Sequence, residues 1–158
     1  MGAMVDRTQM ERVLGYIEAG REEGAELVRG GGRARDESGG FYIEPTIFDG
    51  VRNDMRIAQE EIFGPVLSTI SFDTTEEAMR IANDTIYGLA AGIWTNDLTT
   101  AHRAARELRA GVVWVNCFDA GDISAPFGGF KQSGFGRDKS LHALDKYTDL
   151  KTVWINLA

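Results

Sequence analysis

A single thiol is the most reactive side chain in this sequence. Cys117 is the only cysteine, so the chain forms no intramolecular disulfide, which is typical of a reducing compartment. A cysteine attacks carbon as a thiolate, a form that neighbouring basic residues favour. No basic residue lies near Cys117 in the sequence, and the nearby Asp119 disfavours a thiolate. We therefore expect Cys117 to line a pocket or to pack against neighbours, and not to act as a nucleophile.

The segment around Cys117 also carries two carboxylates, Asp119 and Asp122. Negative charge at the mouth of a pocket suits a substrate with a cationic amine. Acidic loop residues are also common in a chain this acidic, so both interpretations stay open. A metal site is not expected, because His102 and His142 are far apart and have no cysteine at ligand spacing.

A glycine-rich segment, 125–137 (APFGGFKQSGFGR), is the second place where a ligand is expected. Its glycines let the backbone approach a ligand or another backbone closely. The segment follows a predicted strand over 112–116, and open α/β sheets bind ligands where strands end in loops. An ordered connection would need the same glycines, so this alternative also stays open. Neither phosphate-binding motif is complete, because Lys139 replaces the third glycine of one and Phe135 replaces the lysine of the other.

Apolar patterns predict the elements that must position these groups. Helical and strand patterns alternate, which predicts an α/β fold with a mostly parallel sheet and flanking helices. Capping boxes at Thr8 with Glu11 and at Thr74 with Glu77 start two of the helices. The segment 30–40 is expected to be a mobile surface loop. The predicted helices span 8–23, 56–60, 74–86, 98–108 and 139–146; the predicted strands span 25–28, 42–48 with a break at Pro45, 66–72, 89–94 (buried), 112–116 and 150–157.

Length and charge limit the class of protein. A chain of 158 residues is large enough for one domain with a real core. A net charge of −7 argues against a nucleic-acid surface. No apolar run is long enough to span a membrane, and the N-terminus has no secretory apolar segment. We therefore expect a cytoplasmic protein that binds neither nucleic acid nor membrane.

The predicted strand at the C-terminus is apolar on both faces. Val153, Ile155 and Leu157 alternate on one face, while Trp154 lies on the other. An edge strand of this kind readily pairs with another strand. It either closes the sheet of its own chain or adds to the sheet of a neighbour, and we favour the neighbour. The sequence therefore predicts a homo-oligomer.

Three segments together resemble one enzyme family. They are 59–66 (QEEIFGPV), 82–92 (ANDTIYGLAAG) and 126–134 (PFGGFKQSG), and their order and intervals match the C-terminal portion of an NAD(P)-dependent aldehyde dehydrogenase. Residues 137–144 (RDKSLHAL) are most similar to the branch that oxidises γ-glutamyl-γ-aminobutyraldehyde and related amino-aldehydes. The resemblance implies that 1–148 form the C-terminal portion of the catalytic domain and that 149–158 form a terminal oligomerisation strand.

The resemblance assigns roles to particular residues. Glu61 would accept hydrogen bonds from both hydroxyls of the nicotinamide ribose of NAD or NADP, which would aim the ring, and Phe63 would pack against that ring. From the residues alone, Glu60 and Glu61 are ordinary charges near a bend. Phe127, which follows a proline, is in the same way a plain core anchor. The implied substrate pocket comprises Cys117, Phe118, Asp119, Asp122 and Phe127, and the implied interface residues are Arg137, Asp149, Val153 and Ile155.

The same resemblance implies a fragment of an oxidoreductase. In this family a cysteine attacks the aldehyde, hydride passes to the nicotinamide, and a glutamate activates the deacylating water. The equivalents of that cysteine and glutamate are expected to precede this chain. We therefore expect the chain alone to be inactive and not to bind NAD or NADP by itself. One alternative is a self-association module without cofactor binding, and a weaker one is an independent anion-binding loop at 128–136.

Overall fold

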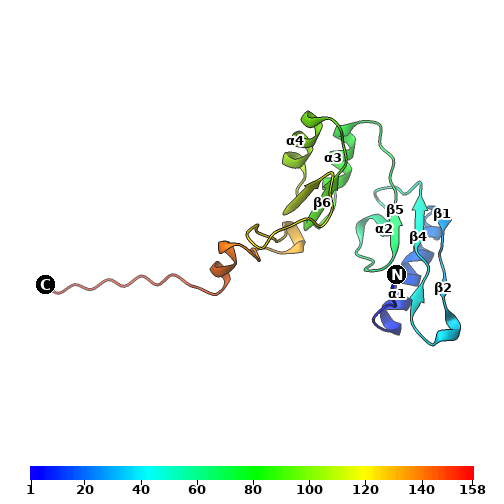
Figure 1. Cartoon of the computed structure of the whole chain (residues 1–158), viewed down its shortest axis with the longest axis horizontal. Helices are drawn as coiled ribbons and strands as arrows, with labels where there is room; N and C mark the ends of the chain where they lie inside the picture. Colours follow the sequence, from blue (N-terminus) through cyan, green and yellow to red (C-terminus); the bar gives the residue numbers. More distant parts are fainter. The chain divides into compact units, whose positions relative to one another are not determined.

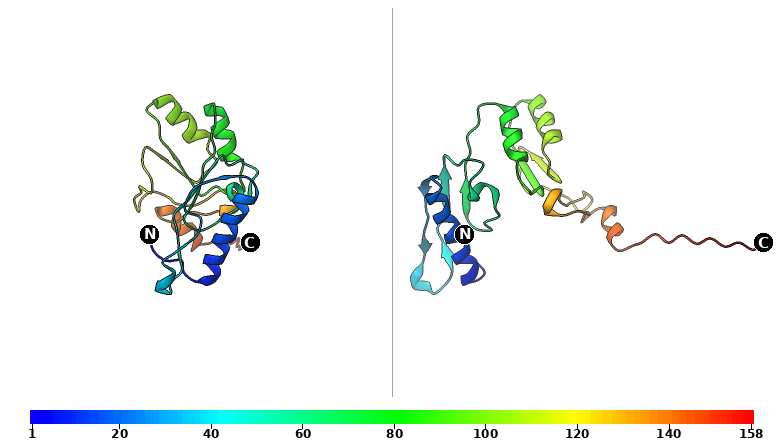
Figure 2. Two further views of the ribbon diagram at one scale, coloured as in Figure 1. Left: turned by 90° about the vertical axis from the view of Figure 1, so that its right-hand side faces the viewer. Right: turned by 180° about the vertical axis from the view of Figure 1, so that it is seen from behind.

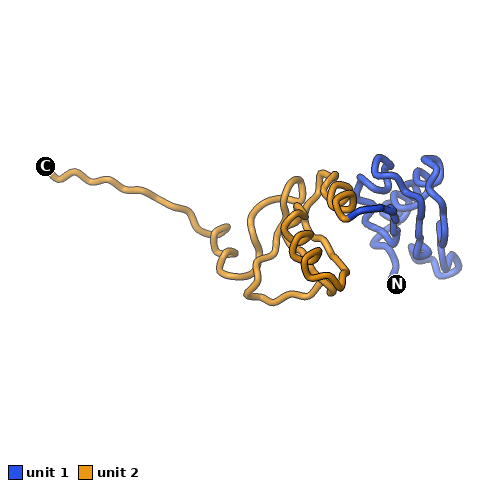
Figure 3. Tube along the Cα trace, turned by 90° about the horizontal axis from the view of Figure 1, so that it is seen from above, with its two compact units in different colours: residues 1–74 blue, residues 75–158 orange.

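The computed structural model describes residues 1–158, which divide into two compact units, Met1–Thr74 and Thr75–Ala158 (Figure 3). The division between unit 1 and unit 2 falls inside the range 1–148 that was expected to form one portion of a catalytic domain. The expected boundary between 148 and 149 stays a prediction. Because no helix combines enough length with enough apolar character, none can cross a membrane.

Unit 1 begins with helix α1 (Arg7–Glu22). The Asp6 carboxylate starts it by accepting a hydrogen bond of 2.8 Å from the Gln9 N–H. The capping box predicted at Thr8 and Glu11 is therefore wrong, because an aspartate two positions earlier already satisfies a free N–H of the first turn. The helix buries one apolar face, which includes Met10, Val13, Tyr16 and Ile17.

Three strands form the main sheet of unit 1, in the order β1-β4-β5 (Figure 1). The central strand β4 pairs antiparallel with β1 and parallel with β5. Pro45 separates β3 from β4, as the predicted break in 42–48 requires, because proline has no N–H for a ladder. The strands are β1 (Glu26–Arg29), β2 (Arg33–Ala34), β3 (Tyr42–Ile43), β4 (Thr46–Asp49) and β5 (Val66–Ser68).

The segment 30–40 is more ordered than the predicted mobile loop. Within it, β2 pairs antiparallel with β3, and the 3₁₀ helix η1 (Asp36–Ser38) lies between the two strands. Gly30 and Gly31 both have positive φ angles, 72° and 99°. The glycines that suggested mobility therefore serve a turn that leads into a short hairpin.

The core of unit 1 lies between α1 and the main sheet (Figure 2). Phe48 of β4 and Val13 of α1 are both 0% exposed. Ile57 joins them from the single turn of α2 (Arg56–Gln59), which was predicted as a helical turn over 56–60, and Met55 joins them from the N-cap of that turn. Burial of these apolar side chains stabilises the unit and fixes the segment that follows α2.

Unit 2 contains two parallel strands and two helices. Strand β6 (Ala90–Ile93) leads through α4 (Leu98–Glu107) to β7 (Val112–Val115), and the two strands pair in parallel. Helix α3 (Thr75–Asn83) precedes them. The predicted α/β class, with parallel pairing and flanking helices, is confirmed, although both antiparallel pairs lie in unit 1.

Strand β6 differs from the buried strand that was predicted over 89–94. Ala90 and Gly92 are exposed, whereas Ala91 and Ile93 are half-buried. A parallel sheet normally has layers on both faces, but a two-stranded sheet with helices to one side leaves alternate residues open. The prediction of a buried strand is therefore wrong for this chain.

The C-terminal part of the chain is less regular than predicted. Two 3₁₀ helices form there, η2 (Lys131–Ser133) and η3 (Leu141–Lys146), the second where a helix was predicted over 139–146. Residues 147–158 then extend without secondary structure (Figures 1 and 2). The predicted strand over 150–157 does not form in this chain, because no backbone partner lies beside it. The alternative in which this segment closes the sheet of its own chain is thus wrong. Its pairing with a neighbouring chain stays a prediction.

Three glycines bring backbone segments of unit 2 into direct contact, and we call Gly88, Gly111 and Gly128 the glycine junction. The Gly111 N–H donates to the Gly88 carbonyl at 3.0 Å, and the Phe130 N–H donates to the same oxygen at 2.8 Å. A Cβ atom on Gly111 would overlap the carbonyl oxygen of Gly128. The glycine-rich segment is therefore an ordered structure packed against the turn after α3.

Replacing Gly111 with alanine tests the glycine junction. The new Cβ would meet backbone that cannot retreat without loss of the hydrogen bond to Gly88. We expect Gly111→Ala to lower the free energy of unfolding of unit 2 by roughly 1–3 kcal/mol, the usual effect of overpacking. All three tryptophans lie in unit 2, so their fluorescence during urea unfolding measures this change.

Gly121→Ala is the matched control in the same unit. The atom nearest to its new Cβ would be Lys139 Nζ, at an ordinary distance of 3.9 Å. This variant should stay within about 0.5 kcal/mol of the parent. Equal losses of stability in both variants would contradict the close approach at Gly111.

Candidate active-site cavities

The predicted site residues gather around two cavities, one in each unit. The cofactor-side cavity in unit 1 has a volume of about 510 Å³ and is lined by residues that include Glu61 and Phe63. The substrate-side cavity in unit 2 has a volume of about 270 Å³ and is lined by residues that include Asp119, Asp122 and Phe127. The fold thus brings together both residues of the first predicted group and three of the second.

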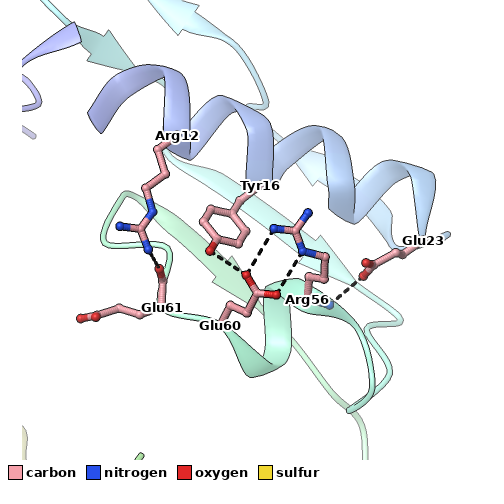
Figure 4. A network of polar contacts seen from close by, with 6 residues as sticks. All are labelled: Arg12, Tyr16, Glu23, Arg56, Glu60 and Glu61. Carbon is pink, nitrogen blue, oxygen red and sulfur yellow. Dashed lines mark hydrogen bonds and ion pairs between the residues drawn. The ribbon is translucent and has the colours of Figure 1, made fainter. Parts of the chain in front are cut away.

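Helix α1 holds the backbone beside the cofactor-side cavity. Arg12 donates from Nη2 to the Glu61 carbonyl at 3.0 Å, as Figure 4 shows. The Gln9 side-chain amide donates to the carbonyls of Ile62 and Phe63 at 3.2 and 3.1 Å. Because these bonds use only backbone oxygens of 61–63, they fix the segment and leave its side chains free.

The Glu61 carboxylate has no partner of its own. It is exposed, it points away from α1 in Figure 4, and it makes no hydrogen bond or ion pair. Phe63 lies beside it with 74% of its surface exposed and with φ at 54°, in the left-handed region. Non-glycine residues adopt that conformation only at a cost in free energy. Residues strained in this way are frequent at functional sites. The cavity therefore presents a free acceptor next to an exposed aromatic ring.

Glu60, the preceding residue, is fully engaged (Figure 4). Tyr16 donates its hydroxyl to Glu60 Oε2 at 2.8 Å, and Arg56 donates to both carboxylate oxygens at 3.1 and 3.2 Å. Arg56, and to a smaller degree Tyr16, hold the pKa of Glu60 below its ordinary value of 4.5. The two adjacent glutamates therefore differ in role, which the sequence alone could not distinguish.

Aromatic and charged residues line the substrate-side cavity together. Trp114 donates its indole N–H to the Ala120 carbonyl at 2.6 Å, which folds the segment after β7 back over the strand. Phe127 supplies a second aromatic wall, and Lys139 Nζ lies 5.6 Å from the centre of its ring. Trp114 and Lys139 are lining residues that the sequence did not indicate. In the sequence, Lys139 was notable only because it interrupts a glycine motif, and Trp114 was an ordinary residue of a predicted strand.

Asp122 is held in place on this cavity by its own loop. It accepts hydrogen bonds from the Ser124 hydroxyl at 2.5 Å and from the Ser124 N–H at 2.8 Å. The Ser124 hydroxyl is the main cause that keeps the pKa of Asp122 below its ordinary range, and the charge of Lys139 contributes less. At neutral pH the cavity therefore carries a firmly ionised carboxylate.

Two predicted pocket residues lie elsewhere. Cys117 is exposed but does not line the substrate-side cavity. Phe118 is also absent from its walls and instead packs against Trp114, with ring centres 5.1 Å apart. The left-handed φ of Asn116, 55°, turns the chain at the end of β7 before these two residues. Their predicted pocket position is thus not seen in this chain.

The predicted interface residues do not form a pair within the chain. Arg137 donates to the carbonyls of Gly129 and Gly136 at 3.1 and 2.6 Å, and its guanidinium lies 5.2 Å from the centre of the Phe130 ring. The Asp149 carboxylate accepts a hydrogen bond from the next backbone N–H. Arg137 therefore braces the glycine-rich segment, and the place of Arg137 and Asp149 at an interface stays a prediction. Val153 and Ile155 are exposed, which leaves them available for a partner.

Comparisons with known proteins identify the family. Residues 1–153 match the aldehyde dehydrogenase family, and the chain belongs to it. It is 49% identical over 158 residues to a betaine aldehyde dehydrogenase of Rhizobium leguminosarum, in an alignment that covers 99% of this chain and 32% of that protein. The chain thus spans about a third of the length of such relatives.

Solved structures of the family have the same fold. An indole-3-acetaldehyde dehydrogenase of P. syringae, in complex with NAD+ and IAA, is 68% identical, with a TM-score of 0.94 over 99% of this chain and 32% of that chain. A γ-glutamyl-γ-aminobutyraldehyde dehydrogenase from Burkholderia cenocepacia is 67% identical, with a TM-score of 0.91 over 96% of this chain and 30% of that chain. The predicted aldehyde dehydrogenase fold is confirmed over about a third of the length of these relatives, and its place in the C-terminal part of the catalytic domain stays a prediction.

Glu60→Gln tests the separate role assigned to Glu60. Because folding lowers the pKa of this carboxylate, its contribution to stability is fully present above the ordinary value and is lost as pH falls through the lowered value. We expect the variant to unfold more easily than the parent at pH 7 and to approach it at acidic pH. Urea titrations followed by NMR signals of α1 measure the difference in unit 1.

Glu11→Gln serves as the control, since this exposed glutamate lies on the same helix and makes no hydrogen bond. Its free energy of unfolding should equal that of the parent over the whole pH range. A constant stability difference between Glu60→Gln and the parent from neutral to acidic pH would refute the role of the ionised carboxylate.

Proposed function

We propose that this chain supplies the nicotinamide-ribose site and part of the substrate pocket of an enzyme that oxidises an aldehyde to a carboxylic acid with NAD or NADP. One observation carries the proposal. The unpaired Glu61 carboxylate and the exposed Phe63 line one cavity, and the backbone of both is fixed from α1. Family membership gives this arrangement its chemical meaning, because relatives of the same fold are seen in complex with NAD+.

The residues of the cofactor-side cavity fit a nicotinamide riboside. An ionised carboxylate accepts hydrogen bonds from two vicinal hydroxyls at once, so Glu61 would hold the ribose. Phe63 would cover one face of the nicotinamide ring, and together they would orient it. When bound, NAD supplies the acceptor for the hydride that leaves the aldehyde carbon. The protein's part in this cavity is to bind and to orient.

The substrate-side cavity supports an amino-aldehyde as the substrate class. Asp119 and Asp122 place two carboxylates on its wall, and Trp114 and Phe127 provide aromatic surface for an alkyl chain. A cationic amine at the far end of the substrate would be attracted by that wall. The relatives named for betaine aldehyde and for γ-glutamyl-γ-aminobutyraldehyde are in keeping with this class.

The attacking group is not assigned to this chain. Cys117 lies outside the substrate-side cavity and has no neighbouring base in sequence, so it is unsuited to attack an aldehyde bound there. The chain by itself is therefore proposed to be inactive. Its exposed C-terminal residues, which include Val153 and Ile155, would pair with a second copy and form a homo-oligomer. A self-association module without cofactor binding is the alternative that this exposed segment also supports.

A hybrid enzyme tests the role of Glu61. In it, this chain replaces the equivalent third of the P. syringae indole-3-acetaldehyde dehydrogenase, with which it shares 68% identity and the same fold. We expect the hybrid to produce NADH from an aldehyde, measured by absorbance. Glu61→Gln should lower kcat/KM for NAD+ by about ten- to a hundredfold, since one charged acceptor is lost.

Glu37→Gln is the control for this experiment, because it removes the same charge from η1, away from the cofactor-side cavity. It should leave kcat/KM for NAD+ unchanged. A hybrid whose Glu61→Gln variant behaves like its Glu37→Gln variant would exclude the ribose site.

The chain alone provides a second test. We expect no aldehyde-dependent NADH from it at any protein concentration, and a light-scattering mass above the 17.4 kDa of one chain. Turnover that Cys117→Ser abolishes would reveal a nucleophile in this chain and overturn the proposed division of roles. A mass of one chain would instead exclude self-association through the C-terminal segment.

A further inference from the structure

Lys139 differs from the lysines nearest to it in the sequence. Lys131 donates from Nζ to the carbonyls of Asn83 and Thr85 at 2.8 and 3.0 Å, and Lys146 forms an ion pair with Asp138. Lys139 forms no ion pair, although it lines the substrate-side cavity. Its ammonium group therefore makes no hydrogen bond and is free to donate one in that cavity, although it lies over the Phe127 ring.

The backbone around Lys139 is built to hold it there. Lys139 and Ser140 have φ angles of 58° and 53°, so two successive non-glycine residues have positive φ. The Ser140 N–H donates to the Ile123 carbonyl at 2.7 Å, and Phe127 and Asp138 exchange hydrogen bonds of 2.8 and 2.7 Å. Strained residues persist only where the surroundings enforce them. The segment that carries Lys139 is thus tied by hydrogen bonds to Ile123 and to Phe127, and Phe127 lines the same cavity.

The ammonium group changes what the cavity can accept. Lys139 Nζ lies 5.6 Å from the centre of the Phe127 ring and so occupies the aromatic face that a cationic substrate would otherwise use. Asp119 and Asp122 carry the opposite charge on the same cavity. A substrate tail with only an ammonium group would meet two attractive carboxylates and one repulsive lysine. A tail with both an ammonium and a carboxylate would find a partner for each.

We propose that Lys139 is a specificity-determining residue that selects aldehydes whose far end carries a carboxylate beside the amine. The inference rests on the proposed function and deepens it from amino-aldehydes in general to those with an amino-acid end group. Lys139 donates a charge-assisted hydrogen bond to the carboxylate, and Asp119 and Asp122 receive the amine. Trp114 and Phe127 flank the chain that leads from this end group to the aldehyde.

A pair of matched substrates tests Lys139 in the hybrid enzyme. The first is 4-aminobutanal acylated on nitrogen by the side-chain carboxyl of glutamate, which keeps a free amine and a free carboxylate. The second is its carboxamide analogue, which lacks only the carboxylate charge. We expect the parent to prefer the first in kcat/KM, and Lys139→Met to reduce that preference by about ten- to a hundredfold.

Two variants control for charge and for position. Lys139→Arg keeps the positive charge and should keep the preference for the carboxylate. Lys151→Met removes a lysine from the extended C-terminal segment and should leave the preference unchanged. If Lys139→Met retained the full preference, or if Lys151→Met lost it equally, Lys139 would not be the selecting residue.

Propanal, which carries no charge, separates this inference from the function on which it rests. Normal turnover of propanal by Lys139→Met, together with a lost preference between the charged substrates, would support the proposal. Normal turnover with an unchanged preference would overturn the role of Lys139 alone. A parent hybrid that oxidises neither propanal nor the matched substrates would overturn the proposed function and this inference with it.

Discussion

Backbone meets backbone at the glycine junction, and the substrate-side cavity depends on that contact. Gly111 leads directly into β7, which carries Trp114, while Gly128 follows Phe127 in the glycine-rich segment. A side chain at Gly111 would meet the backbone of Gly128 and push these two aromatic walls apart, and a side chain at Gly128 would meet the Gly136 carbonyl. The glycines therefore act through the absence of a side chain, and the cavity is a consequence of how closely they pack.

The cofactor-side cavity depends on a different device, in which one helix distinguishes two adjacent glutamates. Tyr16 of α1 binds the Glu60 carboxylate, whereas Arg12 of the same helix binds only the backbone carbonyl of Glu61. Arg56 donates to both oxygens of the Glu60 carboxylate and carries the opposite charge. One carboxylate is thus part of the structure and the other remains a free acceptor, although their chemistry and their position in the sequence are nearly the same.

The groups that line the two cavities are suited to bind and to orient a ligand, and none of them is an evident nucleophile. Neither cavity contains a thiol, and the carboxylates that line them are either engaged, as Glu60 is, or suited to accept hydrogen bonds from a ligand. Exposed apolar surface on β6 and on the C-terminal segment accompanies this pattern. Both features agree with a chain that spans about a third of its relatives' length. In the function proposed above, each cavity would supply surface to an active site of the longer enzyme, and the open faces would supply edges to an assembly.

Much of the local structure could be predicted from the sequence because it follows from neighbouring residues. The helices α1, α2 and α4, the strand β7 and the break at Pro45 arise from apolar spacing and from backbone chemistry that act within a few positions. The three family segments also identified Glu61, Phe63 and Phe127, which do line the two cavities.

Other features required the tertiary structure because they depend on what packs against each segment. The burial of β6, the pairing of the C-terminal segment and the ordering of 30–40 are set by partners that a local pattern cannot specify. The same holds for the site, where Cys117 falls outside a cavity that Lys139 enters. By itself the sequence determined which residue types are available and where helices and strands form. Only the fold decided that Glu60 is engaged whereas Glu61 is free, and that Lys131 is engaged whereas Lys139 is not, because Tyr16 and the Asn83 and Thr85 carbonyls lie far away in the sequence.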